Sequence, residues 1–317
     1  MNNQLAEDFG RELERSERVL LISHIRPDGD AVGSLLGLGH VLLAMGKEIS
    51  LVLEDGVPKS FHHLPGVDLI FQDFGGVFDL IIVLDSSDIT RIGSVLDEYG
   101  QPDVNIDHHP TNTQFAPLNI VETGAVATAE ILYDLIRTLD LPLTPEAAEC
   151  LLTGLITDSL GFRTSNTRPK TFRTAAALQE LGADPAYLHR KALLERSHQA
   201  LLYWGRGLSK IEKEDRLIWT TLTLEDREEV GYPGRDDADL VNILSTVADT
   251  DVCVVFIEQK DGTVKVSWRA EVGYDVSQVA GKFGGGGHKP AAGASIPGRM
   301  ERIVPEVLEE TRTLFAG

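Results

Sequence analysis

The stretch "LISHIRPDGDAVGSLLGL", residues 21–38, joins two apolar segments through a short polar turn. Its first residues are typical of a buried strand and its last residues of an apolar helix. The turn holds His24, Asp28 and Asp30, interrupted by a proline and a glycine. Either Asp28 or Asp30 caps the helix that follows, or all three side chains face one positive charge that the rest of the chain helps to hold.

Short apolar runs of the same kind recur outward from this stretch. They are "RVLLISH", "EISLVLE", "DLIIVLD" and "DVNIDHH", and helical segments are expected between them at residues 31–45 and 91–99. Such runs, rich in Val, Ile and Leu, are typical of a parallel sheet that is covered on both faces. We therefore predict a doubly wound α/β domain with a mainly parallel sheet.

The remainder of the chain divides into a helical part and a second α/β part. Helices are predicted at residues 125–139, 145–160 and 169–181, and a longer helical stretch at 183–213. Strands are predicted at 216–224, 251–259 and 263–271 around a helix at 237–247, with Asp261-Gly262 as a hairpin turn. The predicted domains are residues 1–188, a helical linker at 189–213, and a smaller α/β domain at 214–317.

Composition limits the class of protein. The 317 residues are 42% hydrophobic and 25% charged, as in a soluble globular protein of two domains. A polar N-terminus, no apolar run of membrane-spanning length and only two cysteines predict a cytoplasmic protein without a membrane partner. The net charge of −20 argues against binding long nucleic acid. It permits a short anionic substrate held by metals and a few local cations.

Further polar residues stand at the ends of predicted strands. Asp85 ends "DLIIVLD", and Asp107, His108 and His109 end "DVNIDHH". Because the carboxyl ends of parallel strands open on one edge of the sheet, these side chains should converge with those of the opening turn. Asp158, in "LLTGLITDSLGF", adds a carboxylate to an apolar helix. Each residue alone is explained by a helix cap, a turn or an ion pair, but together they would repel one another unless cations lie among them.

The charge balance suggests how many cations are needed. Asp28, Asp30, Asp85 and Asp158 contribute four negative charges, which two divalent cations would balance. Carboxylate and imidazole ligands without thiolates suit manganese, magnesium, iron or cobalt better than structural zinc. Two metals about 3.5–4 Å apart are an established device for attacking phosphoesters.

These motifs resemble a known family. "HIRPDGDA", "VLDSSD", "IDHH" and "GLITDS" occur in the order and approximate spacing of the DHH phosphoesterase family. "SWRAEVGYDVSQVAGKFGGGGHKPAAGA" resembles the DHH-associated C-terminal domain of that family, and the resemblance extends from about residue 18 to residue 296. It implies a catalytic, metal-binding N-terminal domain and a substrate-binding C-terminal domain.

The resemblance also implies a role for each residue of the cluster. One metal would be held by His24 and Asp28, the other by Asp30, His108 and Asp158, with Asp85 bridging them. Asp107 would orient an imidazole or the turn behind it. His109 would face the scissile phosphate and stabilise charge or protonate the leaving oxygen. Asp85, His108 and His109 are thus the predicted catalytic residues. The predicted cofactors are two divalent cations, manganese first, with magnesium or cobalt as alternatives.

A run of four glycines marks the predicted substrate-binding domain. A flexible linker is the simple explanation, but His288 and Lys289 follow at once, and glycine backbone lets N–H groups approach an anion. Arg269 could bind a phosphate in bidentate fashion, with Ser267 beside it. The predicted substrate-binding residues are His109, Ser267, Arg269, Gly284, Gly285, Gly286, Gly287 and His288.

The family contains several activities. Its pyrophosphatases have a different C-terminal domain, and its RecJ-type exonucleases are longer. The short arrangement resembles the nanoRNase and pAp phosphatase group, which implies hydrolysis of very short oligoribonucleotides to mononucleotides and of 3′-phosphoadenosine 5′-phosphate (pAp) to AMP. The partners would be short RNAs and small nucleotides, in a homodimer. The alternatives are a stand-alone cyclic-di-AMP or pApA phosphodiesterase, a RecJ-like short single-strand exonuclease, and a non-catalytic nucleotide-binding scaffold.

Overall fold

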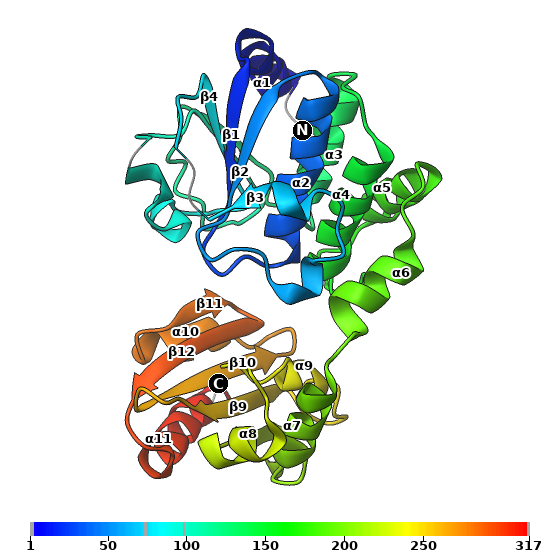
Figure 1. Ribbon diagram of the computed structural model, residues 1–317. Coiled ribbons are helices and arrows are strands. Elements are labelled where there is room, and N and C mark those ends of the chain that lie inside the picture. Colours follow the sequence, from blue (N-terminus) through cyan, green and yellow to red (C-terminus); the bar gives the residue numbers. More distant parts are fainter. Residues whose placement is uncertain (1–2, 73–74, 98, 316–317) are drawn as a thin grey trace. The chain divides into compact units, whose positions relative to one another are not determined.

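The computed structural model describes residues 3–72, 75–97 and 99–315, which form two compact units that divide between Glu195 and Arg196 (Figure 1). The linker predicted at residues 189–213 spans this division. A π-helical turn, Arg190–Leu194, lies in the first unit, and helix α7, His198–Leu208, lies in the second. The domain boundaries at residues 188 and 213 stay a prediction.

The first unit is built on a six-stranded sheet in the order β3-β2-β1-β4-β5-β6, in which every neighbouring pair is parallel. This confirms the predicted doubly wound parallel sheet. The central strands β1 and β4 consist of Val, Ile and Leu apart from the first residue of β1, as expected of strands buried on both faces of a sheet. The strands are β1 (Arg18–Ile22), β2 (Glu48–Val52), β3 (Ile70–Phe71), β4 (Leu80–Leu84), β5 (Val104–Asp107) and β6 (Leu118–Val121).

The strand order reverses next to β1. The chain runs from β1 outward to β2 and β3, then returns to β4 on the other side of β1 and continues to β5 and β6 (Figure 1). In such a sheet, ligands bind at the carboxyl ends of the strands where the order reverses. The loops that follow β1, β4 and β5 begin at this edge.

Helices cover the sheet, and two of them approach unusually closely. A Cβ atom at Gly33 of α2 would lie 2.5 Å from the carbonyl oxygen of Cys150 in α4, and one at Gly154 of α4 would lie 2.6 Å from Asp30 Oδ1. Glycine at both positions lets the start of α2 lie against the last turns of α4. The helices of this unit are α1 (Asn3–Arg15), α2 (Gly29–Ala44), α3 (Thr128–Thr138), α4 (Pro145–Asp158), α5 (Pro169–Glu180) and α6 (Pro185–His189).

Two predicted helical stretches are wrong in detail. The segment at 91–99 contains two short 3₁₀ turns, Ile89–Ile92 and Val95–Asp97, with residue 98 outside the described part of the chain. Asp88 begins the first turn by accepting from Thr90 N at 2.8 Å. Gly93, with a φ of 78°, ends it. The helix predicted at 183–213 breaks after Leu194 and ends before strand β7 (Glu212–Glu214).

The second unit has a mixed sheet in the order β11-β12-β10-β9-β8-β7, antiparallel except between β8 and β9. The predicted hairpin is confirmed, because β9 and β10 pair around Gly262 with φ 80°. The elements are β8 (Leu217–Leu222), β9 (Val252–Glu258), β10 (Thr263–Ala270), β11 (Gly286–His288), β12 (Ala291–Pro297), α8 (Leu224–Val230), α9 (Leu240–Leu244), α10 (Val276–Lys282) and α11 (Met300–Arg312).

Strand β10 presents different residues on its two faces. Val264, Val266 and Trp268 are buried in a core that includes residues of α10 and α11, and Trp268 Nε1 donates to Thr311 Oγ1 of α11 at 3.1 Å. The alternate residues Ser267 and Arg269 lie on the opposite, partly exposed face. Among the described helices of both units, none combines the length and the apolar character that crossing a membrane requires.

Candidate metal centre

The turn after β1 satisfies both explanations of its carboxylates. Asp28 is the N-cap of α2, and its Oδ1 accepts from Asp30 N at 3.0 Å and Ala31 N at 3.1 Å. Its Oδ2 lies 3.9 Å from Nε2 of His24. One oxygen of Asp28 therefore caps the helix, and the other remains directed at the cluster.

His24 has the properties of a metal ligand. Its Nδ1 lies 2.8 Å from the carbonyl oxygen of Ile25, which can only accept, so Nδ1 carries the proton and the neutral ring has its lone pair on Nε2. This Nε2 is buried, has no hydrogen-bond partner among the described residues, and lies 3.5 Å from Asp85 Oδ2. Burial lowers the pKa of His24, but the carboxylates of Asp85 and Asp28 outweigh this effect and raise it. A buried nitrogen lone pair facing carboxylate oxygens fits a divalent cation.

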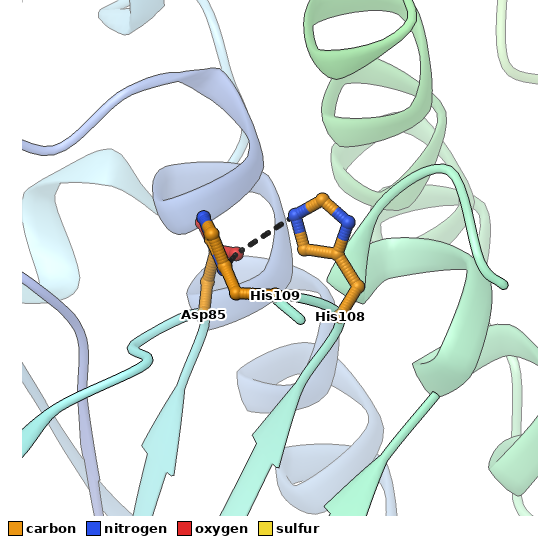
Figure 2. Close-up of side chains that lie close together, drawn as sticks. All are labelled: Asp85, His108 and His109. Atoms are coloured by element: carbon orange, nitrogen blue, oxygen red, sulfur yellow. Dashed lines mark ion pairs between the residues drawn. The ribbon is translucent and has the colours of Figure 1, made fainter. Parts of the chain in front are cut away.

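Asp85 lies between two groups of side chains. It is the first residue after β4, is 1% exposed, and has a left-handed φ of 56°, which aspartate tolerates better than most residues. Its Oδ2 faces His24. Its Oδ1 lies 3.7 Å from His108 Nε2 and 3.8 Å from His109 Nδ1, and Figure 2 shows these three side chains close together. Burial alone would raise the pKa of Asp85, but the three histidines hold it well below its usual range. The carboxylate is thus ionised, with one oxygen toward each group.

The second group combines residues from three elements. His108 follows β5, Asp30 lies in the first turn of α2, and Asp158 ends α4, and one ligand atom from each lies within 4.8 Å of the others. His108 Nε2 is 3.2 Å from Asp158 Oδ2. Burial lowers the pKa of His108, which favours the neutral ring, the form that can offer a lone pair. Burial, and then neighbouring carboxylates, raise the pKa of both Asp30 and Asp158 well above the usual value. A cation among them would remove this penalty.

Asp30 caps a helix distant in sequence. Its Oδ2 accepts from Thr128 N at 2.6 Å, and its Oδ1 accepts from Ala129 N and Ser34 Oγ, each at 3.1 Å. These N–H groups begin α3, whose own N-cap residue, Ala127, makes no side-chain cap. A carboxylate has about four lone-pair sites, so these three bonds leave one, on Oδ2, for a cation.

His109 is held by a hydrogen-bond chain. Its Nδ1 donates to Asp107 Oδ1 at 2.7 Å. The other oxygen of the fully buried Asp107 accepts from Asn112 Nδ2 at 2.6 Å, which also lies 2.8 Å from Asn105 Oδ1. Burial lowers the pKa of His109, but the bond to Asp107 outweighs it and raises the pKa above its ordinary value. The imidazole that Asp107 contacts is therefore that of His109.

The predicted substrate-binding residues of the second unit lie on adjacent strands. Ser267 of β10 is opposite Gly293 of β12, which is opposite Gly286 of β11. Two residues further along β10, Arg269 is opposite Ala291, which is opposite His288. Gly284 and Gly285 lie between α10 and β11. The register therefore brings Ser267 and Arg269 close to the end of the glycine run within this unit.

The guanidinium of Arg269 is anchored. Its Nε donates to Asn242 Oδ1 of α9 at 3.0 Å, and its Nη1 donates to the carbonyl oxygen of Trp268 at 2.9 Å. These bonds fix the plane of the guanidinium and leave its remaining N–H groups directed elsewhere. An anchored guanidinium loses less entropy on binding a phosphate.

Sequence reasoning missed three residues that contact the predicted site. Asn112 donates to Asp107, Thr128 Oγ1 donates to Asp85 Oδ1 at 2.9 Å, and Asn242 accepts from Arg269. Asparagine and threonine near loops and helix starts usually cap or form turns. Nothing in the local sequence distinguishes these three from such residues. The partners of Thr128 and Asn242 are distant along the chain, and the bond from Asn112 to Asp107 depends on how the loop after β5 folds.

The fold and the site define an α/β protein whose carboxylates and imidazoles, gathered where the order of a parallel sheet reverses, could hold metal ions. The chain belongs to the DHH family: residues 18–155 match "DHH family, N-terminal domain", and residues 228–316 match the DHHA1 domain. The family resemblance deduced from the motifs is thus confirmed.

Named relatives narrow the class further. A protein of Thermus thermophilus named bifunctional oligoribonuclease and PAP phosphatase NrnA is 34% identical over 299 residues, which are 92% of this chain and 90% of that protein. A protein of Mycoplasma genitalium with the same name is 30% identical over 298 residues, 91% of this chain and 92% of that one. The crystal structure of an exopolyphosphatase-related protein from Bacteroides fragilis, 26% identical, superposes with a TM-score of 0.92 over 100% of this chain and 98% of that one.

Proposed function

We propose that this DHH-family phosphoesterase hydrolyses very short oligoribonucleotides to mononucleotides and pAp to AMP. The observation that carries the proposal is that the predicted ligand residues lie together, with one oxygen of Asp85 turned toward His24 and the other toward His108. The names of the relatives, which match over nine-tenths of the chain, support the choice of substrates.

Two divalent cations would occupy the centre. His24 and Asp28 would hold one, Asp30, His108 and Asp158 the other, and Asp85 would bridge them. Manganese suits this ligand set, with magnesium or cobalt as alternatives. Bound there, the cations supply an activated water and positive charge for the phosphoryl oxygens.

His109 is the residue that would act on the reacting phosphate. Because its Nδ1 is bonded to Asp107, Nε2 is the atom that would meet a phosphoryl or leaving oxygen. The raised pKa of His109 favours the protonated ring, which can donate to an oxygen that develops negative charge. Asp107 and Asn112 would keep the ring in this orientation.

The second unit would hold the remote part of the substrate. Arg269, fixed by Asn242, would bind a second phosphate, with Ser267 and His288 beside it. Main-chain N–H groups of Gly284 to Gly287 would approach the same anion. A homodimer, which the family resemblance implies, belongs to this proposal as well.

The experiment is a turnover panel in manganese. Its substrates are pAp, RNAs of two to five nucleotides, a long RNA and a long DNA strand, and cyclic-di-AMP. The proposal expects rapid hydrolysis of pAp and the shortest RNAs. Faster turnover of cyclic-di-AMP would favour the stand-alone phosphodiesterase, equal turnover of the long strands the exonuclease, and no turnover at all the non-catalytic scaffold.

A further inference from the structure

Thr128 contacts two carboxylates of the candidate metal centre at once. It is the first residue of α3 and is fully buried. Its main-chain N–H donates to Asp30 Oδ2 at 2.6 Å, and its hydroxyl donates to Asp85 Oδ1 at 2.9 Å. Thr128 therefore connects Asp85, which lies between the two groups, with Asp30 of the second group.

The direction of the hydroxyl is informative. Because Thr128 is the first residue of α3, no earlier turn of the helix offers a carbonyl to its hydroxyl. The hydroxyl reaches instead a carboxylate 43 positions earlier in the chain. The hydroxyl is the donor of this bond, and the carboxylate oxygen is the acceptor.

The hydroxyl restricts a torsion that the backbone leaves loose. The terminal torsion of an aspartate side chain is broad and roughly two-fold, and the left-handed backbone of Asp85 does not set it. The bond from Thr128 occupies one lone pair of Oδ1 and leaves the other, while Oδ2 remains turned toward His24.

We propose that Thr128 is the positioning residue that fixes the Asp85 carboxylate so that each oxygen serves one of two cation sites. The inference rests on the two-cation function proposed above. Loss of a contact that orients a metal ligand typically costs about ten- to a hundredfold in metal affinity. Because Asp30 is held by the main chain of Thr128, a change of side chain removes the contact to Asp85 alone.

The test measures metal binding without substrate. The metal-free chain is titrated with Mn²⁺ by calorimetry as the parent and as Thr128→Val, Thr128→Ser and Thr153→Val. Thr153 is the matched control: it is fully buried in α4, and its hydroxyl donates to the carbonyl oxygen of Glu149 at 3.0 Å. Thermal unfolding of each metal-free variant checks that it is folded.

We expect Thr128→Val to weaken at least one Mn²⁺ site about tenfold or more, and Thr128→Ser and Thr153→Val to stay within about threefold of the parent. Parental affinity in Thr128→Val, or an equal loss in Thr128→Ser, would overturn the inference, the latter by showing that packing of the methyl group matters. If Thr128→Val does not fold, Thr128→Ala is titrated and judged by the same criterion. A parent chain that binds fewer than two Mn²⁺ ions would defeat the proposed function itself, and this inference with it.

Discussion

Asp85 is the residue on which the charge balance of the centre depends. Asparagine keeps its shape and also tolerates the left-handed backbone, so Asp85→Asn removes the charge with little strain. We expect turnover to fall by more than about a hundredfold, the upper end of the cost of a merely orienting contact. The metal-free variant should stay folded but melt at a lower temperature, because the histidines that hold the pKa of Asp85 low also stabilise its carboxylate in the folded state. Activity within tenfold of the parent in saturating manganese would contradict the bridging assignment.

Asp30 and Asp158 should make metal binding depend on pH. Burial and neighbouring carboxylates raise the pKa of both in the folded, metal-free chain. The folded state then holds more protons than the unfolded state, so their contribution to stability is complete below the ordinary carboxyl pKa and is lost as pH rises through the raised values. Cations displace these protons, so the Mn²⁺-induced rise in melting temperature should grow from about pH 5 to about pH 8.

Asp158→Asn provides the comparison for this pH effect. It removes one of the two protons that Mn²⁺ must displace, so the pH dependence of the Mn²⁺-induced shift should become shallower. The measurement is the melting temperature with and without Mn²⁺ at each pH, for parent and variant. A shift that does not vary with pH in the parent would show that these carboxyl groups are already ionised in the metal-free chain.

Residues that end strands were predictable, and residues that support them were not. Asp85 and His108 follow apolar runs, and parallel strands bring such ends to one edge whatever the loops do. The dual use of Asp28 and Asp30 as helix caps and cluster members could not be decided from sequence, because both uses require the same residue type. Thr128 depends on α3 beginning beside Asp85, which is a tertiary fact.

At the scale of elements, the close approach of α2 and α4 positions the second group. A Cβ atom at Gly154 would lie 2.6 Å from Asp30 Oδ1 and 2.8 Å from Ala129 Cβ. Overpacking of this kind costs about 1–3 kcal/mol. We expect Gly154→Ala to lower the melting temperature by several degrees and to weaken Mn²⁺ binding.

Gly205→Ala is the matched control, because Gly205 lies inside α7 and a Cβ atom there would meet nothing within 4 Å. Alanine is favoured over glycine inside a helix, so this variant should be as stable as the parent or more so. Unchanged Mn²⁺ affinity in a folded Gly154→Ala variant would show that Asp30 has more room to move than its contacts suggest.

The glycine run shows where element prediction fails. Glycine is depleted in strands, yet Gly286 and Gly287 belong to β11, which pairs with β12. A Cβ atom at Gly285 or Gly287 would meet the backbone of β12, whereas one at Gly286 would meet nothing within 4 Å. Close backbone approach, rather than flexibility, accounts for the glycines at these two positions.

At the scale of the whole molecule, the proposal assigns the chemistry to the first unit and the binding of a remote phosphate to the second. Losing one charge-assisted contact costs about 1.5–3 kcal/mol, roughly ten- to a hundredfold in kcat/KM. Arg269→Ala should therefore reduce kcat/KM for pAp and dinucleotides by this factor, and change it far less for a small activated ester with one phosphate. Lys265→Ala, a charge removed from the same face of β10, should affect neither. An equal loss on both substrates in Arg269→Ala would place Arg269 at the reacting phosphate and end this division.

The acidity of the molecule leads to a prediction about salt. Each phosphate neutralised on a single strand contributes about 0.7 to the slope of log affinity against log salt. With a net charge of −20, phosphates beyond the bound few should find no further cations. The salt dependence of KM should therefore be the same for RNAs of two and five nucleotides. A slope that steepens with each added nucleotide would reveal an extended binding track.

The double use of Asp28 and Asp30 also bears on how such a chain could evolve. Replacing either residue removes a proposed ligand and uncaps a helix, so a lineage that abandons catalysis would lose stability if it lost these positions first. No hydrogen bond to a helix start ties down His108 or Asp158 among the described contacts. In a lineage that loses the activity, substitutions should therefore appear first at His108 or Asp158. Asp28 and Asp30 should be retained longer, because they still cap helices.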